Sequence, residues 1–279
     1  MNALQPLAPT IVCLAAVLGL LVGSFLNVVV HRVPAGLSVV RPASACPACR
    51  AEIRAFDNVP VLSWIVLRGA CRDCGSRISA RYPLVEAGTS ASFALVTGGV
   101  LASGVVHAAP TGPTLVLLVG LLYLMAVSIS LALIDLDTHR LPDAIVLPAY
   151  PVLGVLLATS SATTGDWGAL LRAVGGAAIM FVLYLALAVV VPGGMGMGDV
   201  KLAGVLGLVL AYLGWGPLAV GAFGGFALGA TFAIGLLVTR RAARGSGIPF
   251  GPWMLGGAWL GILIGTPLWN AYLGLIGLT

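Results

Sequence analysis

Charged residues are scarce in this sequence, and their scarcity excludes an ordinary soluble domain. Asp, Glu, Lys and Arg make up 8% of the 279 residues, whereas 59% are hydrophobic and the mean hydropathy is +1.08. A soluble chain of this length has no means of keeping so much apolar surface out of water. The composition therefore predicts a polytopic membrane protein.

The sequence also lacks the marks of a cleavable signal peptide and of a nucleic-acid-binding surface. Its first apolar stretch has no basic segment before it and no small-residue cleavage site, and it continues to Val30, so we interpret it as a first membrane span. The formal charge is +5, but no aromatic residues alternate with the basic ones, which argues against nucleic acid as a partner. The positive charge instead fits membrane topology and anionic lipid headgroups.

Long apolar runs are what the sequence has in abundance. A helix needs about 20 apolar residues to cross a bilayer. Stretches that approach this length lie at residues 8–30, 83–106, 114–134, 142–160, 168–191, 200–214, 216–239 and 250–275. The pattern predicts eight spans, of which the sixth is short.

Basic residues gather in alternate loops and so indicate the orientation, because Lys and Arg accumulate on the cytoplasmic side. With the N-terminus outside, all arginines between residues 32 and 81 fall in the first inner loop. Only Arg172 lies near the outer face. The later inner loops hold Arg140, Lys201, Arg240, Arg241 and Arg244.

Four of the five cysteines lie in the one long polar segment. Cys46 and Cys49 form one CxxC pair, and Cys71 and Cys74 form another, a spacing typical of two zinc knuckles that close one tetrahedral site. Thiolates bind zinc where disulfides are reduced, which agrees with a cytoplasmic loop. We predict a structural zinc ion, because four thiolates leave no open coordination position. A pair of disulfides or a redox pair is the alternative.

The fold class that we expect is an all-α polytopic membrane protein with about eight transmembrane helices and a small cytoplasmic zinc-binding loop domain. The expected organisation is a first transmembrane helix at residues 1–30, a cytoplasmic four-cysteine loop at 31–82 and a transmembrane core at 83–279. A loop of this size has little apolar core, so the metal would supply much of its folding energy.

Two acidic residues lie at membrane depth, where a carboxylate is costly unless it is shielded or needed for chemistry. Asp135 follows the apolar run that ends at Ile134, and Asp199 comes just before another apolar run. Both fall on the cytoplasmic side in the predicted topology. Because two carboxyl groups can pass protons, the pair predicts an active site.

The residues beside the second aspartate are rich in glycine. Gly196 and Gly198 let the backbone pass close to a neighbouring helix or to an extended peptide. Irregular backbone at membrane depth is tolerated only where it lines protein or water, so we favour a cleft over a flexible linker with an acidic cap. Lys201 is two positions from Asp199, not on the same helical face, and is expected to reach the lipid headgroups.

Asp143 and Glu86 complete the residues that we expect to line the site. Asp143 follows Pro142 at the predicted start of a helix, where an acidic residue suits the positive end of the helix dipole. That structural interpretation is the favoured one for Asp143. Glu86 lies just inside the second span, where it pairs with Arg81 or lines the cleft.

Taken in this order, the motifs resemble the bacterial type IV prepilin peptidases, which are membrane-embedded aspartic proteases of the GxGD type and also N-methyltransferases. The resemblance runs over nearly the whole chain and includes the paired CxxC motifs. It rests further on the segments from Gly23 to Arg32, Arg81 to Glu86, Ile134 to Asp143, Gly196 to Lys201 and Ile248 to Pro252.

The resemblance implies that Asp135 and Asp199 are a catalytic dyad that cleaves the basic leader from prepilins or secretion pseudopilins, at the cytoplasmic face of the bacterial inner membrane. It also implies that the new amino terminus is methylated by S-adenosylmethionine, and that Gly69 takes part in methyl transfer. Many relatives hold a longer insertion where this chain has the short run of residues 33–45. The sequence leaves the oligomeric state open.

Two like carboxyl groups close together cannot both ionise readily, so they share a proton. Asp199 lies at an expected helix N-terminus and Asp135 at a C-terminus, so the helix dipoles predict Asp199 as the initial base. Two other functions stay open. A proton-coupled carrier also uses buried aspartates but predicts an internal repeat, which we do not find. A scaffold that recruits a secretion complex leaves both aspartates without a task.

Overall fold

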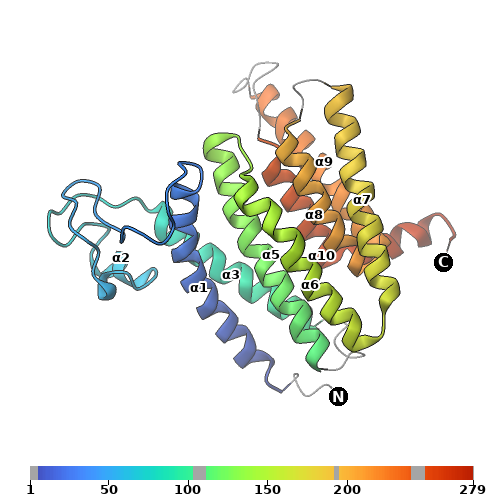
Figure 1. Ribbon diagram of the computed structural model, residues 1–279, viewed down its shortest axis with the longest axis horizontal. Helices are drawn as coiled ribbons and strands as arrows, with labels where there is room; N and C mark the ends of the chain where they lie inside the picture. Colours follow the sequence, from blue (N-terminus) through green and yellow to red (C-terminus); the bar gives the residue numbers. More distant parts are fainter. Residues whose placement is uncertain (1–5, 103–110, 192–194, 240–248, 279) are drawn as a thin grey trace. The chain divides into compact units, whose positions relative to one another are not determined.

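The computed structural model describes residues 6–102, 111–191, 195–239 and 249–278, and over these ranges it contains helices and two isolated β-bridges but no strand (Figure 1). Eight long helices coincide with the eight apolar runs: α1 (Ala8–Arg32), α3 (Arg81–Ala102), α5 (Thr111–Thr138), α6 (Asp143–Thr164), α7 (Trp167–Val190), α8 (Met197–Leu213), α9 (Trp215–Val238) and α10 (Gly251–Leu275). Between α1 and α3, the loop holds the short helices η1 (Ala55–Asp57) and α2 (Leu62–Val66). The all-α prediction is confirmed.

Six of these helices are long and apolar enough to cross a membrane: α1, α3, α5, α6, α7 and α9. The other two differ for separate reasons. Helix α8 has only 17 residues, and the Gly, Pro, Trp and Asn residues of α10 dilute its apolar ones. The basic residues Arg240, Arg241 and Arg244 and the expected span end at 103–106 lie outside the described residues.

The chain forms two compact units. The first comprises Met1–Thr111 and Leu121–Ser130, and the second comprises Gly112–Gly120 and Leu131–Thr279. The four-cysteine loop therefore belongs to the first unit. Both aspartates of the expected dyad belong to the second.

In the first unit, α1 packs against α3 through glycines. A Cβ atom at Gly19 would meet Cα of Ser90 at 2.7 Å, and one at Gly23 would meet Cα of Glu86 at 2.7 Å. The Ser90 hydroxyl also donates a hydrogen bond of 2.8 Å to the carbonyl oxygen of Ala16. Close packing of this kind, with side-chain hydrogen bonds, is what holds helices together in lipid, where the hydrophobic effect between them is missing.

In the second unit, α8 is the central helix, since every residue from 202 to 212 is buried. Gly207 lies directly against Gly176 of α7, and Leu210 packs on Gly221 of α9. From α6, the Tyr150 hydroxyl reaches the first turns of α8. The helix that begins with Asp199 in its first turn is therefore held on several sides.

Candidate active site

Asp135 lies in the last turn of α5, which ends three residues later at Thr138. Its side chain is buried, and Oδ2 accepts a hydrogen bond of 3.0 Å from the backbone N–H of Gly251, the first residue of α10. A Cβ atom at Gly251 would meet this same oxygen at 2.8 Å. The carboxyl group of Asp135 is therefore held against the N-terminus of α10, the positive end of that helix dipole.

Asp199 is the third residue of α8 and is half-buried. Its Oδ2 accepts a hydrogen bond of 3.0 Å from the backbone N–H of Gly196, the residue just before the helix. A carboxylate in this place binds one of the N–H groups that a helix start leaves without an intrahelical partner. As the sequence predicts, Asp199 lies at a helix N-terminus.

The structure brings the two carboxyl groups close enough to interact electrostatically. Leu141 packs beside both. A Cβ atom at Gly198, next to Asp199, would meet Cβ of Leu141 at 2.9 Å. One at Gly251, next to the Asp135 carboxyl group, would meet Cδ2 of Leu141 at 3.3 Å. Gly198 and Gly251 thus leave room for Leu141 beside the start of α8, which carries Asp199, and the start of α10, which binds Asp135.

Lys201 forms an ion pair with Asp143, whose two carboxylate oxygens both lie 2.8 Å from Nζ. The sequence did not predict this partner for the ammonium group, and the expectation that Lys201 reaches the headgroups stays a prediction. Asp143 is the first residue of α6, as predicted. Tyr150, further along α6, donates a hydrogen bond of 2.7 Å to the carbonyl oxygen of Lys201. Two contacts from α6 thus fix the first turns of α8.

Three aromatic rings pack together, and one of them interacts electrostatically with Asp199. The ring centroid of Phe226 lies 5.4 Å from those of both Tyr184 and Phe250. Tyr184 is 1% exposed and interacts electrostatically with Asp199, and Phe250 precedes Gly251 in the chain. Sequence reasoning missed Tyr184 and Phe226 because they lie in helices that are apolar on all sides, where no periodic pattern singles out a residue.

Glu86 and Gly69 lie in the first unit. Glu86 is 8% exposed, and Oε2 accepts a hydrogen bond of 2.7 Å from the N–H of Val61. Gly69 has φ +66°, and a Cβ atom there would meet the Trp64 ring at 2.8 Å. These contacts give both residues a structural role in the first unit. The expected role of Glu86 in the site and that of Gly69 in methyl transfer stay predictions.

The four loop cysteines converge. Their Sγ atoms all lie within 4.8 Å of one another, with 3.8 Å between Cys46 and Cys74 and 4.0 Å between Cys49 and Cys71. A tetrahedral zinc ion with Zn–S bonds of about 2.3 Å places its sulfur ligands about 3.8 Å apart. All four are free cysteines. The donor set fits a zinc ion and does not support the disulfide alternative.

Hydrogen bonds prepare one of these cysteines to bind a metal. The Ser76 hydroxyl oxygen lies 3.4 Å from Sγ of Cys46. This contact, followed by the backbone N–H groups of Cys49 and Ala48, lowers the pKa of Cys46 from 9.0 to about 6. Because the thiolate is the form that binds metals, Cys46 is ready to do so at neutral pH.

Two family models match the chain. The model of the bacterial peptidase A24 N-terminal domain matches residues 17–99, which include the whole four-cysteine loop. The model of the type IV leader peptidase family matches residues 122–234, which include both aspartates. No solved structure matches the chain.

Relatives cover the chain almost from end to end. A protein from Pseudomonas putida is 39% identical over 95% of both chains. One from Neisseria gonorrhoeae is 36% identical over 97% of this chain and 96% of its own. Both are named prepilin leader peptidase/N-methyltransferase. With this identity and coverage, the chain belongs to the type IV leader peptidase family.

Proposed function

We propose that the protein removes the leader from prepilins or pseudopilins, with Asp135 and Asp199 as the catalytic dyad. The observation that supports this proposal is that two carboxyl groups from separate helices, α5 and α8, belong to one compact unit and interact electrostatically, with Leu141 packed beside both. The name shared by relatives that match the chain over most of its length supports the same activity. If the protein were a carrier or a scaffold, its similarity to these relatives would be unexplained.

The dyad activates water without a covalent intermediate. Two carboxyl groups at close range share one proton. The ionised member takes a proton from the water molecule that attacks the scissile carbonyl, and the protonated member gives its proton to the leaving amine. Asp135, like Asp199, lies against a helix N-terminus, that of α10. Helix dipoles therefore no longer distinguish the two, and either can start as the base.

The place of the dyad suits a substrate with a basic leader and an apolar helix. Asp135 is in the last turn of α5 and Asp199 in the first turn of α8, so both lie at helix ends and not at mid-span. In the topology that the basic residues predict, these ends face the cytoplasm. A leader that stays in the cytoplasm then meets the dyad where its apolar helix enters the bacterial inner membrane.

We assign zinc to Cys46, Cys49, Cys71 and Cys74, where it holds the loop together. Four thiolate ligands leave no position for water or substrate, so the ion takes no part in peptide hydrolysis. Methyl transfer from S-adenosylmethionine rests on the name of the relatives. A Cβ atom at Gly69 would meet the Trp64 ring, so close packing explains the glycine without a cofactor contact.

The test of cleavage uses purified protein in detergent, a prepilin and detection of the shortened product. Asp135→Asn and Asp199→Asn are each expected to lower the rate by about a thousandfold or more, because each removes one proton carrier. Asp166→Asn is the matched control. Asp166 accepts the N–H of Ala169 at 2.9 Å at the start of α7, and asparagine caps a helix equally well, so full activity is expected. Product formed at the normal rate by either dyad variant would overturn the mechanism.

Methylation is tested separately on the same product. Mass spectrometry of its new amino terminus, with and without S-adenosylmethionine in the reaction, is expected to show one added methyl group only when the cofactor is present. An unmodified terminus in both reactions would restrict the protein to leader removal.

A further inference from the structure

The short helix α2 turns apolar side chains outward. Leu62, Ile65 and Val66 are 61%, 58% and 73% exposed, and together they make up most of this five-residue helix, Leu62–Val66. If the loop stood clear of the membrane, all three would face water. Exposed apolar residues grouped in this way indicate a surface that something apolar covers.

The segment that leads into α2 is bound to the side of α3, more than one helical turn after the first residue of that helix. Val61 donates its N–H to the buried carboxylate of Glu86 at 2.7 Å. Glu86 lies five residues after Arg81, the first residue of α3, which is about 7 Å along a helix that rises about 1.5 Å per residue. The loop therefore reaches below the level at which α3 begins.

The backbone at this contact is strained. Val61 has φ +62° and ψ −50°, a conformation that β-branched residues rarely adopt. Across it, the N–H of Leu62 donates a hydrogen bond of 2.6 Å to the carbonyl oxygen of Pro60, which closes a γ-turn of the rare, left-handed kind. Such strain persists only where the surroundings hold it in place, and here the hydrogen bond to Glu86 does so.

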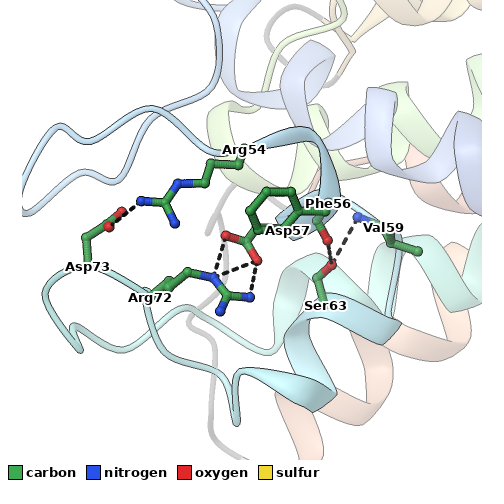
Figure 2. Close-up of polar contacts among 7 residues, drawn as sticks. All are labelled: Arg54, Phe56, Asp57, Val59, Ser63, Arg72 and Asp73. Carbon is green, nitrogen blue, oxygen red and sulfur yellow. Dashed lines mark hydrogen bonds and ion pairs between the residues drawn. The ribbon is translucent and has the colours of Figure 1, made fainter.

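A second side chain holds the same segment from the other direction. The Ser63 hydroxyl donates a hydrogen bond of 3.2 Å to the carbonyl oxygen of Phe56 and accepts one of 3.0 Å from the N–H of Val59 (Figure 2). The path from η1 to α2 is thus determined by side-chain contacts at both ends. Its depth against α3 follows from these contacts.

Between this segment and the two spans lies an apolar groove of about 540 Å³. Its walls include residues 59–62, Val17 and Leu21 of α1, and Ala91 and Ala94 of α3. Val17 and Leu21 are themselves 55% and 57% exposed, and they belong to a helix that is long and apolar enough to cross a membrane. The groove is therefore continuous with a surface that faces lipid.

The polar part of the loop gathers around η1. Arg72 pairs with Asp57 through contacts of 2.6 to 3.0 Å, and Arg54 pairs with Asp73 at 3.0 Å (Figure 2). Both guanidinium groups also lie over the ring of Phe56, 5.5 Å and 6.0 Å from its centre. Arginine and aromatic side chains suit the headgroup region, beside apolar residues that reach deeper.

We propose that residues 59–66 are embedded in the membrane interface, with α2 lying among the acyl chains next to the headgroups and a phospholipid acyl chain filling the groove. Interfacial helices bury their apolar face by about 5–10 Å, which agrees with the depth of Glu86 in α3. The loop returns to the bilayer at both ends, through α1 and α3, so the surface lies within reach of lipid.

Photo-crosslinking tests the proposal on the full chain in phospholipid vesicles. The photoreactive residue p-benzoylphenylalanine replaces Ile65 or Val66, and lipid adducts are measured by mass spectrometry. Glu52 and Arg77, exposed residues of the β-bridges beside the metal cysteines, are the control positions. Adducts at Ile65 and Val66 are expected to exceed those at the controls by about tenfold or more, as for interfacial residues against aqueous ones.

The groove is tested without a bulky probe in α2. Native mass spectrometry of the unaltered protein is expected to show one retained phospholipid, and Ala91→Leu, which fills the groove, is expected to lower the lipid-bound fraction by about fivefold or more. Equal adduct yields at α2 and at the control positions would overturn the proposal. So would adducts at Ile65 and Val66 to a second copy of the chain in place of lipid.

Discussion

The backbone N–H of Gly251 donates a hydrogen bond of 3.0 Å to Oδ2 of Asp135, which lies 116 positions earlier in the chain. The carboxyl group from the end of α5 is thereby fixed by the start of α10. Asp199 is held within its own helix by Gly196. The dyad therefore depends on three helices, and its geometry is sensitive to small changes at either glycine.

Gly251→Ala is expected to lower the rate of leader cleavage by about tenfold to a hundredfold, because the added Cβ would meet the Asp135 oxygen at 2.8 Å and displace it. Gly175→Ala in α7 is the matched control, since a Cβ there meets nothing within 4 Å. Steady-state kinetics on a prepilin, with kcat and KM measured separately, provide the check. An unchanged kcat for Gly251→Ala would show that the dyad tolerates the shift.

The Asp143 and Lys201 pair is expected to position the helix that carries Asp199. Either Asp143→Asn or Lys201→Met should lower kcat by about threefold to tenfold. The exchange variant, Asp143→Lys with Lys201→Asp, should restore part of the loss. The pair is exposed, so it adds only about 0–1 kcal/mol to stability, and the melting temperature should stay nearly constant. If the effects of Asp143→Asn and Lys201→Met on kcat simply add when the two are combined, the positioning role is wrong.

Zinc is expected at a stoichiometry of one per chain in the purified protein. Cys49→Ser or Cys71→Ser removes one thiolate, and either variant should bind zinc at least about a hundredfold more weakly. Cys13→Ser, in α1 and outside the cluster, should keep the full metal content. Elemental analysis measures the metal, and limited proteolysis should show that the loop is cut faster once zinc is lost.

Ser76→Ala is expected to move metal binding to higher pH. Without the Ser76 hydroxyl, the pKa of Cys46 rises from about 6 toward 9.0, so protons compete with the metal over a higher range of pH. The midpoint of a cobalt titration, followed by absorbance as the pH is raised, should shift upward. Ser38→Ala, which removes a hydroxyl elsewhere in the same loop, should leave the midpoint in place.

Arg172 is expected to stabilise α8 from its far end. Its guanidinium group donates hydrogen bonds of 2.7 Å to the carbonyl of Ala211 and 2.8 Å to that of Tyr212. Arg172→Ala should destabilise the protein by about 2 kcal/mol, the range for hydrogen bonds to a charged group. Arg172→Lys should recover part of this loss, since an ammonium group binds the carbonyls without the guanidinium fork. Thermal unfolding in detergent is the measurement.

Arg172 is also an exception to the rule that basic residues accumulate on the cytoplasmic side. It is the one basic residue that the predicted topology places near the outer face. The orientation rule counts basic residues on each side of the membrane, but it does not predict what an individual side chain binds. The structure gives it a local task, because the last carbonyl groups of a helix lack intrahelical partners. Lys201 likewise has a local partner, Asp143, that the sequence did not predict.

The sequence by itself determined the eight helices and the metal cluster. All but one of the apolar runs are close to the length that crosses a bilayer. A chain in lipid has to satisfy its backbone hydrogen bonds within the segment, so helix follows from hydropathy alone. The CxxC pairs likewise bring their thiols together over short stretches of chain. Asp135 and Asp199 stood out for a local reason as well, the cost of a carboxylate at membrane depth.

Only the tertiary structure decided what these side chains touch. Gly251 binds Asp135, and Leu141, which lies between α5 and α6, packs against Gly198 and Gly251, both far from it in sequence. Such contacts arise from the close packing of small residues, and in helices that are apolar on every side no periodic pattern marks the face that packs. The composition of a membrane helix therefore predicts that it is a helix and which of its residues are reactive. Which residues of other helices they contact is determined only by the packing.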